Sequence, residues 1–150
     1  GIMGEIANSV LKYNGKVIGV IPENLVKREA ALREVTELKI VKSMHERKAK
    51  FLEDIDGLVT LAGGSGTLEE LLEAITLKRL GQFTKPIIIL NTNGFYDPLK
   101  QMLEKCVTEK FMDERHLQMW TFVDEPEQVI HSIYNATIWD KESIKFATNQ

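Results

Sequence analysis

The chain has few of the residues that build disulfides and metal centres. Its 150 residues include one cysteine, three histidines and four prolines. The single cysteine, Cys106, excludes an intrachain disulfide and a cysteine-rich zinc site, so a reducing, cytoplasmic setting is the expectation. His116 and His131 have no second ligand at metal-binding spacing, and we therefore expect no metal.

Long hydrophobic runs and a surplus of one charge are also missing. The apolar run at 87–90 is typical of the longest ones, whereas a helix needs roughly 20 apolar residues to cross a bilayer. The start has no basic-then-apolar signal sequence. The 19 basic and 22 acidic residues give a net charge of −3, and nucleic-acid-binding proteins usually carry a basic surplus. We expect neither a membrane nor a nucleic acid as partner.

What the chain does have is the composition of one folded domain, with 43% apolar and 27% charged residues over 150 positions. Helices are expected at 3–13, 44–55, 67–80, 96–109 and 126–135, and strands at 16–21, 37–41, 57–61, 85–91 and 119–123. The alternation, with almost continuously apolar strands, predicts an α/β fold: a Rossmann-like parallel sheet with helices on both faces. The polar tail after Trp139 is expected to be partly ordered.

A glycine-rich segment at 61–67 joins the strand at 57–61 to the helix that follows. Its glycines allow positive φ and a close approach of backbone amides to a ligand. A helix N-terminus adds unpaired N–H groups and partial positive charge, and Thr67 adds a hydroxyl. The Walker and dinucleotide motifs do not match, because no lysine follows Gly66 and Glu69 stands where a third glycine would be needed. The alternatives are a plain tight turn and a phosphate site, and three glycines favour the phosphate site.

Two cations flank the apolar stripe of the helix expected at 44–55. At about 100° per residue, Arg47 and Lys48 lie on either side of the stripe that contains Met44 and Phe51. Their stems could cover apolar surface while the charged ends reach water. The sharper interpretation is a cationic pocket at the mouth of the sheet.

Glu70 lies opposite the apolar stripe of the helix expected at 67–80, beside Ala74 and Leu77. A carboxylate one turn beyond an anion loop could act as a general base or stabilise developing positive charge. The alternative is a helix-dipole role, which Glu69 would fill equally well. The second apolar side predicts a helix buried on two sides, against another subunit.

Together these segments resemble the Lonely-guy family of cytokinin-activating enzymes, sometimes labelled lysine-decarboxylase-like. The family pattern P-G-G-x-G-T-x-x-E is matched at 62–70, except that Ala62 replaces the proline. The pattern M-H-x-R-K is matched fully at 44–48. G-L-M-G is close to the sequence at 1–4, and V-I-G-V-I-P is reproduced at 17–22.

The resemblance covers residues 1 to about 134. In the family, a strand, a helix and a second strand precede G-L-M-G, whereas this chain begins there, without an initiator methionine. The resemblance therefore implies a single Rossmann-like nucleotide-binding domain at 1–150 that lacks the family's first elements.

The family's reaction is hydrolysis of the N-glycosidic bond of a purine nucleoside 5′-monophosphate, of cytokinin type or AMP, to free base and ribose 5-phosphate. The resemblance implies that Glu70 and Arg47 are catalytic and that the protein is a homodimer whose only other partner is the nucleotide. The implied binding residues are Gly1, Met3, Met44, Lys48, Gly63, Gly64, Ser65, Gly66 and Thr67. No metal or other cofactor is expected, and nothing marks a pyridoxal-phosphate lysine.

A non-catalytic nucleotide or cofactor carrier on the same fold is the alternative, because a fold does not determine function. A carrier needs the phosphate loop, but it has no need of Arg47 and Glu70. Their joint presence favours the enzyme.

Overall fold

The computed structural model describes residues 1–26 and 35–147 of the chain, which forms two compact units, Gly1–Glu53 and Asp54–Gln150. The expected α/β class is confirmed, because every strand pair in the described residues is parallel and helices alternate with strands. The expectation of a single domain stays a prediction. The two units are described in turn.

The first unit is a two-stranded parallel sheet with two helices. Its elements are α1 (Ile2–Lys12), β1 (Ile18–Pro22), the 3-10 turn η1 (Glu23–Leu25), β2 (Glu37–Val41) and α2 (Met44–Leu52). The register pairs Ile18 with Glu37 and Pro22 with Val41. Within the described residues of this unit, Gly19, Ile21, Pro22 and Val41 are the buried ones, so its core is small.

Local side-chain chemistry sets the ends of the helices in this unit. The hydroxyl of Ser43 accepts the amide of Glu46 at 3.1 Å, and the carboxylate of Glu46 accepts the amide of Lys42 at 2.8 Å. These bonds satisfy N–H groups at the start of α2, close to the expected capping pattern. The helix α2 ends at Leu52 rather than at residue 55. The backbone is extended at Glu53 and left-handed at Asp54, with φ 55°, so it leaves the helical conformation there.

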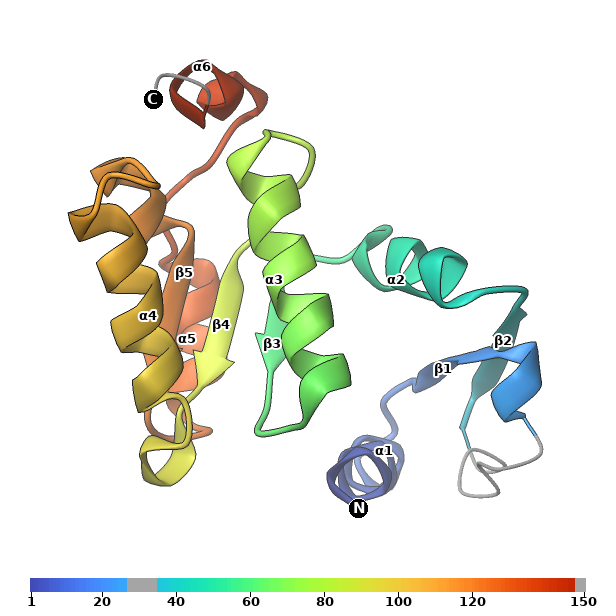
Figure 1. The fold of residues 1–150 in the computed structure, drawn as a ribbon. Coiled ribbons are helices and arrows are strands. Elements are labelled where there is room, and N and C mark those ends of the chain that lie inside the picture. The colour runs from blue at the N-terminus through green and yellow to red at the C-terminus, as the bar shows by residue number, and fades with distance from the viewer. Residues whose placement is uncertain (27–34, 148–150) are drawn as a thin grey trace. The chain divides into compact units, whose positions relative to one another are not determined.

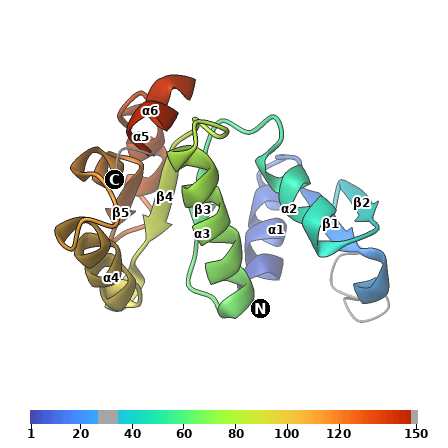
Figure 2. The same cartoon turned by 45° about the horizontal axis from the view of Figure 1, so that its top comes forward.

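The second unit is a three-stranded parallel sheet in the order β3-β4-β5. Its strands are β3 (Leu58–Thr60), β4 (Ile87–Leu90) and β5 (Trp120–Val123). Its helices are α3 (Ser65–Arg79), α4 (Asp97–Thr108), α5 (Gln128–Tyr134) and α6 (Ile144–Ala147), with 3-10 turns η3 (Thr92–Gly94), η4 (Glu114–Gln118) and η5 (Lys141–Ser143). Helices α3 and α4 lie on one face of the sheet and α5 on the other (Figure 1, Figure 2).

The central strand explains why both faces are covered. All four residues of β4 are buried, as expected for a strand between two layers of helices. Ile88 and Leu90 form one cluster with Val123, against which Val129 and Ile133 of α5 pack. This arrangement places the carboxyl ends of β3, β4 and β5 at one edge, and there the glycine loop begins.

The C-terminal tail packs more closely than the sequence indicates. Trp139 is buried, and its indole donates a hydrogen bond to the carbonyl of Lys78 at 2.9 Å. Arg79 donates to the carbonyl of Ala147 at 3.0 Å. The last carbonyls of a helix need donors from outside, and Trp139 supplies one of them. The expectation of a partly ordered tail after Trp139 stays a prediction. Residues 148–150 lie outside the described part.

Lys78 is buried beneath this tail, 1% exposed, and its ammonium donates to the carbonyl of Lys85 at 2.8 Å. Burial lowers the pKa of Lys78 from 10.5 to about 8, because the charged form loses its hydration. Between pH 8 and pH 10.5, a larger fraction of Lys78 is protonated in the unfolded chain than in the folded one. The Lys78 contribution to stability therefore rises with pH in that window and is lost as the pH falls through 8.

We predict that Lys78→Met removes this pH dependence. Urea unfolding of the wild type and the variant between pH 7 and 10.5 should show that the free energy of unfolding rises in the wild type relative to Lys78→Met. Lys105→Met, at an exposed position, is the control and should follow the wild type. Parallel pH curves for wild type and Lys78→Met would contradict the prediction.

Candidate active site

The glycine loop delivers a set of backbone donors at the start of α3. The first helical hydrogen bond runs from the amide of Leu68 to the carbonyl of Gly64 at 3.1 Å. The amides of Ser65, Gly66 and Thr67 precede that bond, so the helix itself has no carbonyl for them. Gly64 is the N-cap and has no side chain that could accept from them. Such a helix start, with its partial positive charge, is suited to an anion.

The absence of a side chain has different consequences at the three glycines of the loop. A Cβ on Gly63 would lie 2.2 Å from Oγ1 of Thr67, so only glycine lets the threonine fold back onto the loop. A Cβ on Gly64 or Gly66 would meet no atom within 4 Å, so the space beside them is open. The expected positive φ is wrong for this loop, because the described glycines with positive φ are Gly81 and Gly94. At Gly63 the missing side chain allows close packing against Thr67, and at Gly64 and Gly66 it leaves open space beside the backbone.

Glu70 lies in the second turn of α3 and is half-buried. The buried face of the helix consists of Leu71, Ala74, Ile75 and Lys78, at helical spacing. The carboxylate therefore stands at the border of that face, one turn beyond the loop amides. Half-burial lowers the solvent screening of a charge and strengthens its effect on a bound ligand.

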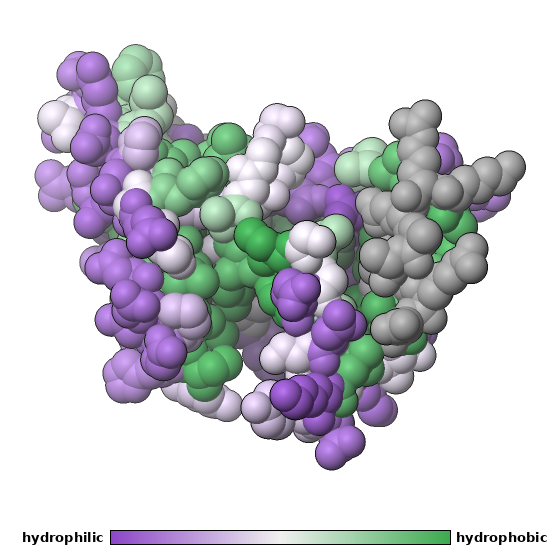
Figure 3. All heavy atoms as spheres, turned by 90° about the horizontal axis from the view of Figure 1, so that it is seen from below, coloured by the Kyte–Doolittle hydropathy of each residue, from purple (hydrophilic) through white to green (hydrophobic). Residues whose placement is uncertain are grey.

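Two expectations for the faces of α3 are corrected by this packing. Ala74 is fully buried within the single chain, so it does not need a second subunit to cover it. Leu72, expected on the buried stripe, is 41% exposed because the core contacts centre on Leu71 and Ile75. Figure 3 shows hydrophobic residues exposed among hydrophilic ones on the face of the molecule that it draws.

Arg47 is held in place within the first unit. Its Nε donates to the carbonyl of Val20 in β1 at 3.2 Å, and its guanidinium lies 4.5 Å from the ring centroid of Phe51. Both contacts fix the side chain, so it is a positioned cation rather than one that simply extends into water. Lys48 beside it is half-buried.

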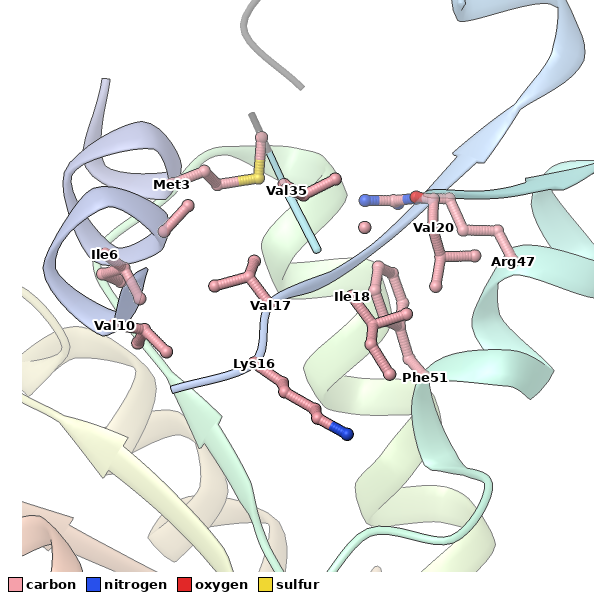
Figure 4. A pocket seen from close by; sticks show the side chains of 12 residues that line it. Met3, Ile6, Val10, Lys16, Val17, Ile18, Val20, Val35, Arg47 and Phe51 are labelled. Atoms are coloured by element: carbon pink, nitrogen blue, oxygen red, sulfur yellow. The ribbon is translucent and has the colours of Figure 1, made fainter. Parts of the chain in front are cut away.

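An apolar pocket of about 350 Å³ opens between α1, β1 and α2 (Figure 4). Met3 and Arg47 both line it, so the structure brings together two of the predicted site residues. Val17, just before β1, and Ile18, its first residue, supply apolar walls. The pocket therefore combines hydrophobic walls with two cationic side chains, the positioned Arg47 and Lys16.

The remaining predicted residues divide between the two units. Gly1 is the N-cap of α1, and Met44 opens α2 with 42% of its surface exposed. These residues, with Met3, Arg47 and Lys48, belong to Gly1–Glu53, whereas the loop 63–67 and Glu70 belong to Asp54–Gln150. Each unit thus holds one part of the predicted site, and their union in one site stays a prediction.

Sequence reasoning missed a buried tyrosine that contacts the loop. The hydroxyl of Tyr96 donates to the carbonyl of Leu61, the residue that follows β3, at 2.6 Å. The side chain of Asn91, at the end of β4, accepts the amide of Tyr96 at 2.6 Å. The position of Asn91 at the carboxyl end of a buried strand was the signal that could have found this group.

The described residues contain neither a metal-binding cluster nor a membrane-spanning helix. No group of three or more histidine, cysteine or acidic side chains in 1–26 and 35–147 could hold a metal ion. Over the same residues, no helix is long and apolar enough to cross a membrane.

Comparison with known proteins places these features in a family. Residues 3–133 match the family described as "Possible lysine decarboxylase". The chain belongs to this family. The match includes both the glycine loop and the segment at 44–48, so the two sequence motifs and the family assignment agree.

Relatives from plants carry a functional name within this family. The chain is 45% identical over 114 residues to the cytokinin riboside 5′-monophosphate phosphoribohydrolase LOG of rice (Oryza sativa), covering 76% of this chain and 47% of the relative. It is 34% identical over 158 residues to LOG4 of Arabidopsis thaliana, which carries the same name, covering 99% of this chain and 74% of that one. The chain spans about half the length of most of the curated relatives that it matches.

The contact between Gly63 and Thr67 leads to a stability prediction. Gly63→Ala should lower the free energy of unfolding by about 1–3 kcal/mol, because the new methyl group overlaps the threonine side chain. Gly64→Ala is the matched control, and its methyl group meets open space, so its effect should stay below about 1 kcal/mol. Equal losses in urea unfolding of the two variants would contradict the packing argument.

Proposed function

We propose that this protein hydrolyses the N-glycosidic bond of a purine nucleoside 5′-monophosphate, of cytokinin type or AMP, and releases the free base and ribose 5-phosphate. The observation that carries the proposal is the start of α3, where unpaired amides and open space at Gly64 and Gly66 stand one turn before Glu70. The name of the relatives supports the same reaction and the same class of substrate.

The phosphate of the nucleotide binds at the loop. The amides of Ser65, Gly66 and Thr67 donate to its oxygens, and the helix dipole stabilises its charge. From Ser65 to Glu70 the helix rises roughly 7 Å. A phosphate at the helix start therefore places the ribose ring beside the carboxylate.

The chemistry requires a negative charge at the ribose. When the bond between C1′ and the base nitrogen breaks, its electron pair leaves with the base and positive charge develops on the ring. The carboxylate of Glu70 stabilises that charge and orients the water that attacks C1′. The water's proton ends on the departing base, so the step balances without a cofactor.

Arg47 supplies the second charged group. Its guanidinium is fixed by Val20 and Phe51, so its position costs little further ordering when a ligand binds. In the proposal it meets the nucleotide from the segment at 44–48 and assists departure of the base. The apolar walls near Met3 belong to the same unit and suit a hydrophobic part of a ligand.

Glu70→Gln tests the proposed mechanism, because it keeps the shape and removes the charge. We expect kcat for base release to fall by roughly 10²–10⁴ while the Kd for AMP stays within about threefold, since the loop amides hold the phosphate. Glu69→Gln, the exposed neighbour, is the control and should retain activity. The assay separates free base from nucleotide by chromatography.

Turnover near the wild-type level in Glu70→Gln would contradict the mechanism. Binding of AMP without release of any base by the wild type would favour a nucleotide carrier instead. Arg47→Ala should also slow base release, and it should weaken AMP binding if the guanidinium reaches the phosphate.

We also propose that the protein is a homodimer and that α3 contributes to the interface. Leu72 exposes 41% of its surface on this helix, and a second subunit would remove this apolar side chain from water. Sedimentation at about 50 micromolar should give the mass of a dimer, and Leu72→Asp should shift it toward the monomer. A wild-type monomer at this concentration would refute the proposal. Met102→Asp, at an exposed apolar position on α4, is the control and should leave the dimer intact.

A further inference from the structure

We propose that Tyr96 is a positioning residue for phosphate binding, acting through its hydrogen bond to the backbone that leads into the glycine loop. The inference rests on the proposed function, because it takes the amides of the loop as the phosphate site. Tyr96 itself touches no reacting atom in this account. Its role is to fix where the loop begins.

The hydrogen bond lies where the sheet stops supporting the chain. The ladder between β3 and β4 ends with Thr60 opposite Ile89, so the carbonyl of Leu61 lies one residue beyond it. The hydroxyl of Tyr96 donates to this carbonyl at 2.6 Å. The phenol thus donates to the first carbonyl beyond the β3–β4 ladder, at the residue where the glycine-rich segment 61–67 begins.

Tyr96 is itself held by a rigid set of contacts. Asn91 is buried, and its backbone amide donates to the carbonyl of Val123 in β5 at 2.7 Å. Its side-chain oxygen accepts the amide of Tyr96 at 2.6 Å, and its side-chain nitrogen donates to Asp97 at 2.8 Å. A continuous chain of hydrogen bonds therefore links β5, the start of α4 and the end of β3.

The environment also keeps the phenol a hydrogen-bond donor. Only 2% of Tyr96 is exposed, and the ring packs edge-on against Phe95 with 4.9 Å between centroids. Burial raises the pKa of Tyr96, because the phenolate would lose its hydration. The hydroxyl proton is therefore present over the whole physiological range.

Loss of the hydrogen bond from Tyr96 would affect phosphate binding and not the chemical step. Displacement of the loop weakens the phosphate contacts in the ground state and in the transition state alike. A loss of that kind raises KM and the Kd and leaves kcat nearly unchanged. Glu70→Gln has the opposite signature, so the two roles are separable.

The experiment compares Tyr96→Phe with Tyr134→Phe in the full-length protein. Both variants lose one hydroxyl, but Tyr134 is 85% exposed in the same unit. Calorimetry gives the Kd for AMP and for adenosine, which lacks the phosphate, and the base-release assay gives KM and kcat. For Tyr96→Phe we expect Kd for AMP and KM to rise about three- to tenfold, as for the loss of one hydrogen bond, with kcat within about twofold. Adenosine binding and the Tyr134→Phe control should stay at wild-type values.

Each other outcome overturns a distinct claim. If Tyr96→Phe lowers Tm but leaves the Kd and KM unchanged, the tyrosine is merely structural. If it weakens AMP and adenosine equally, it does not act through the phosphate site. If the wild type binds AMP but releases no base, the proposed reaction fails, and the Kd values still decide the role of Tyr96. If the wild type does not bind AMP, both proposals fail.

Discussion

The proposed phosphate site depends on the backbone amides at the start of α3 that the helix leaves without carbonyl partners. Their direction is fixed by covalent continuity with β3 on one side and by the first helical bond, from Leu68 to Gly64, on the other. The contact of Thr67 with Gly63 closes the loop onto the helix, and open space at Gly64 leaves the donors accessible. A fixed array of donors costs no reorganisation when an anion binds, which is why this arrangement suits a phosphate.

The rest of the second unit holds both ends of that helix. At its start, Tyr96 and Asn91 tie the end of β3 to β4 and β5. At its end, Trp139 and the tail pack on the carbonyl of Lys78, and a Cβ on Gly81 would lie 2.4 Å from the carbonyl of Lys141. These contacts explain why α3 can present Glu70 at a definite place, although the sheet of this unit has only three strands.

Elements whose signal is local could be predicted from the sequence. The bounds expected for β2 agree with the structure, and the start of α2 at Met44 was predicted from Ser43 and Glu46, because these signals lie within a few residues. The glycine loop at the start of α3 was predicted for the same reason, and its anion chemistry stays a prediction. What depends on long-range packing could not be predicted: Leu72 is exposed, Ala74 is covered within the chain, Trp139 reaches back to Lys78, and Tyr96 bonds to Leu61 across 35 positions. The sequence predicted positive φ and close approach of the amides to a ligand for the loop glycines, whereas at Gly63 the structure shows close packing against Thr67, which only the fold reveals.

The proposed function requires the amides of Ser65, Gly66 and Thr67 to hold the phosphate of the nucleotide. The most direct measurement is an NMR titration of ¹⁵N-labelled full-length protein with AMP and, separately, with adenosine. The account predicts that these three amide resonances shift on addition of AMP, saturate with its binding, and move far less with adenosine, which lacks the phosphate. Amide resonances that stay in place with AMP, or that shift equally with both compounds, would contradict it.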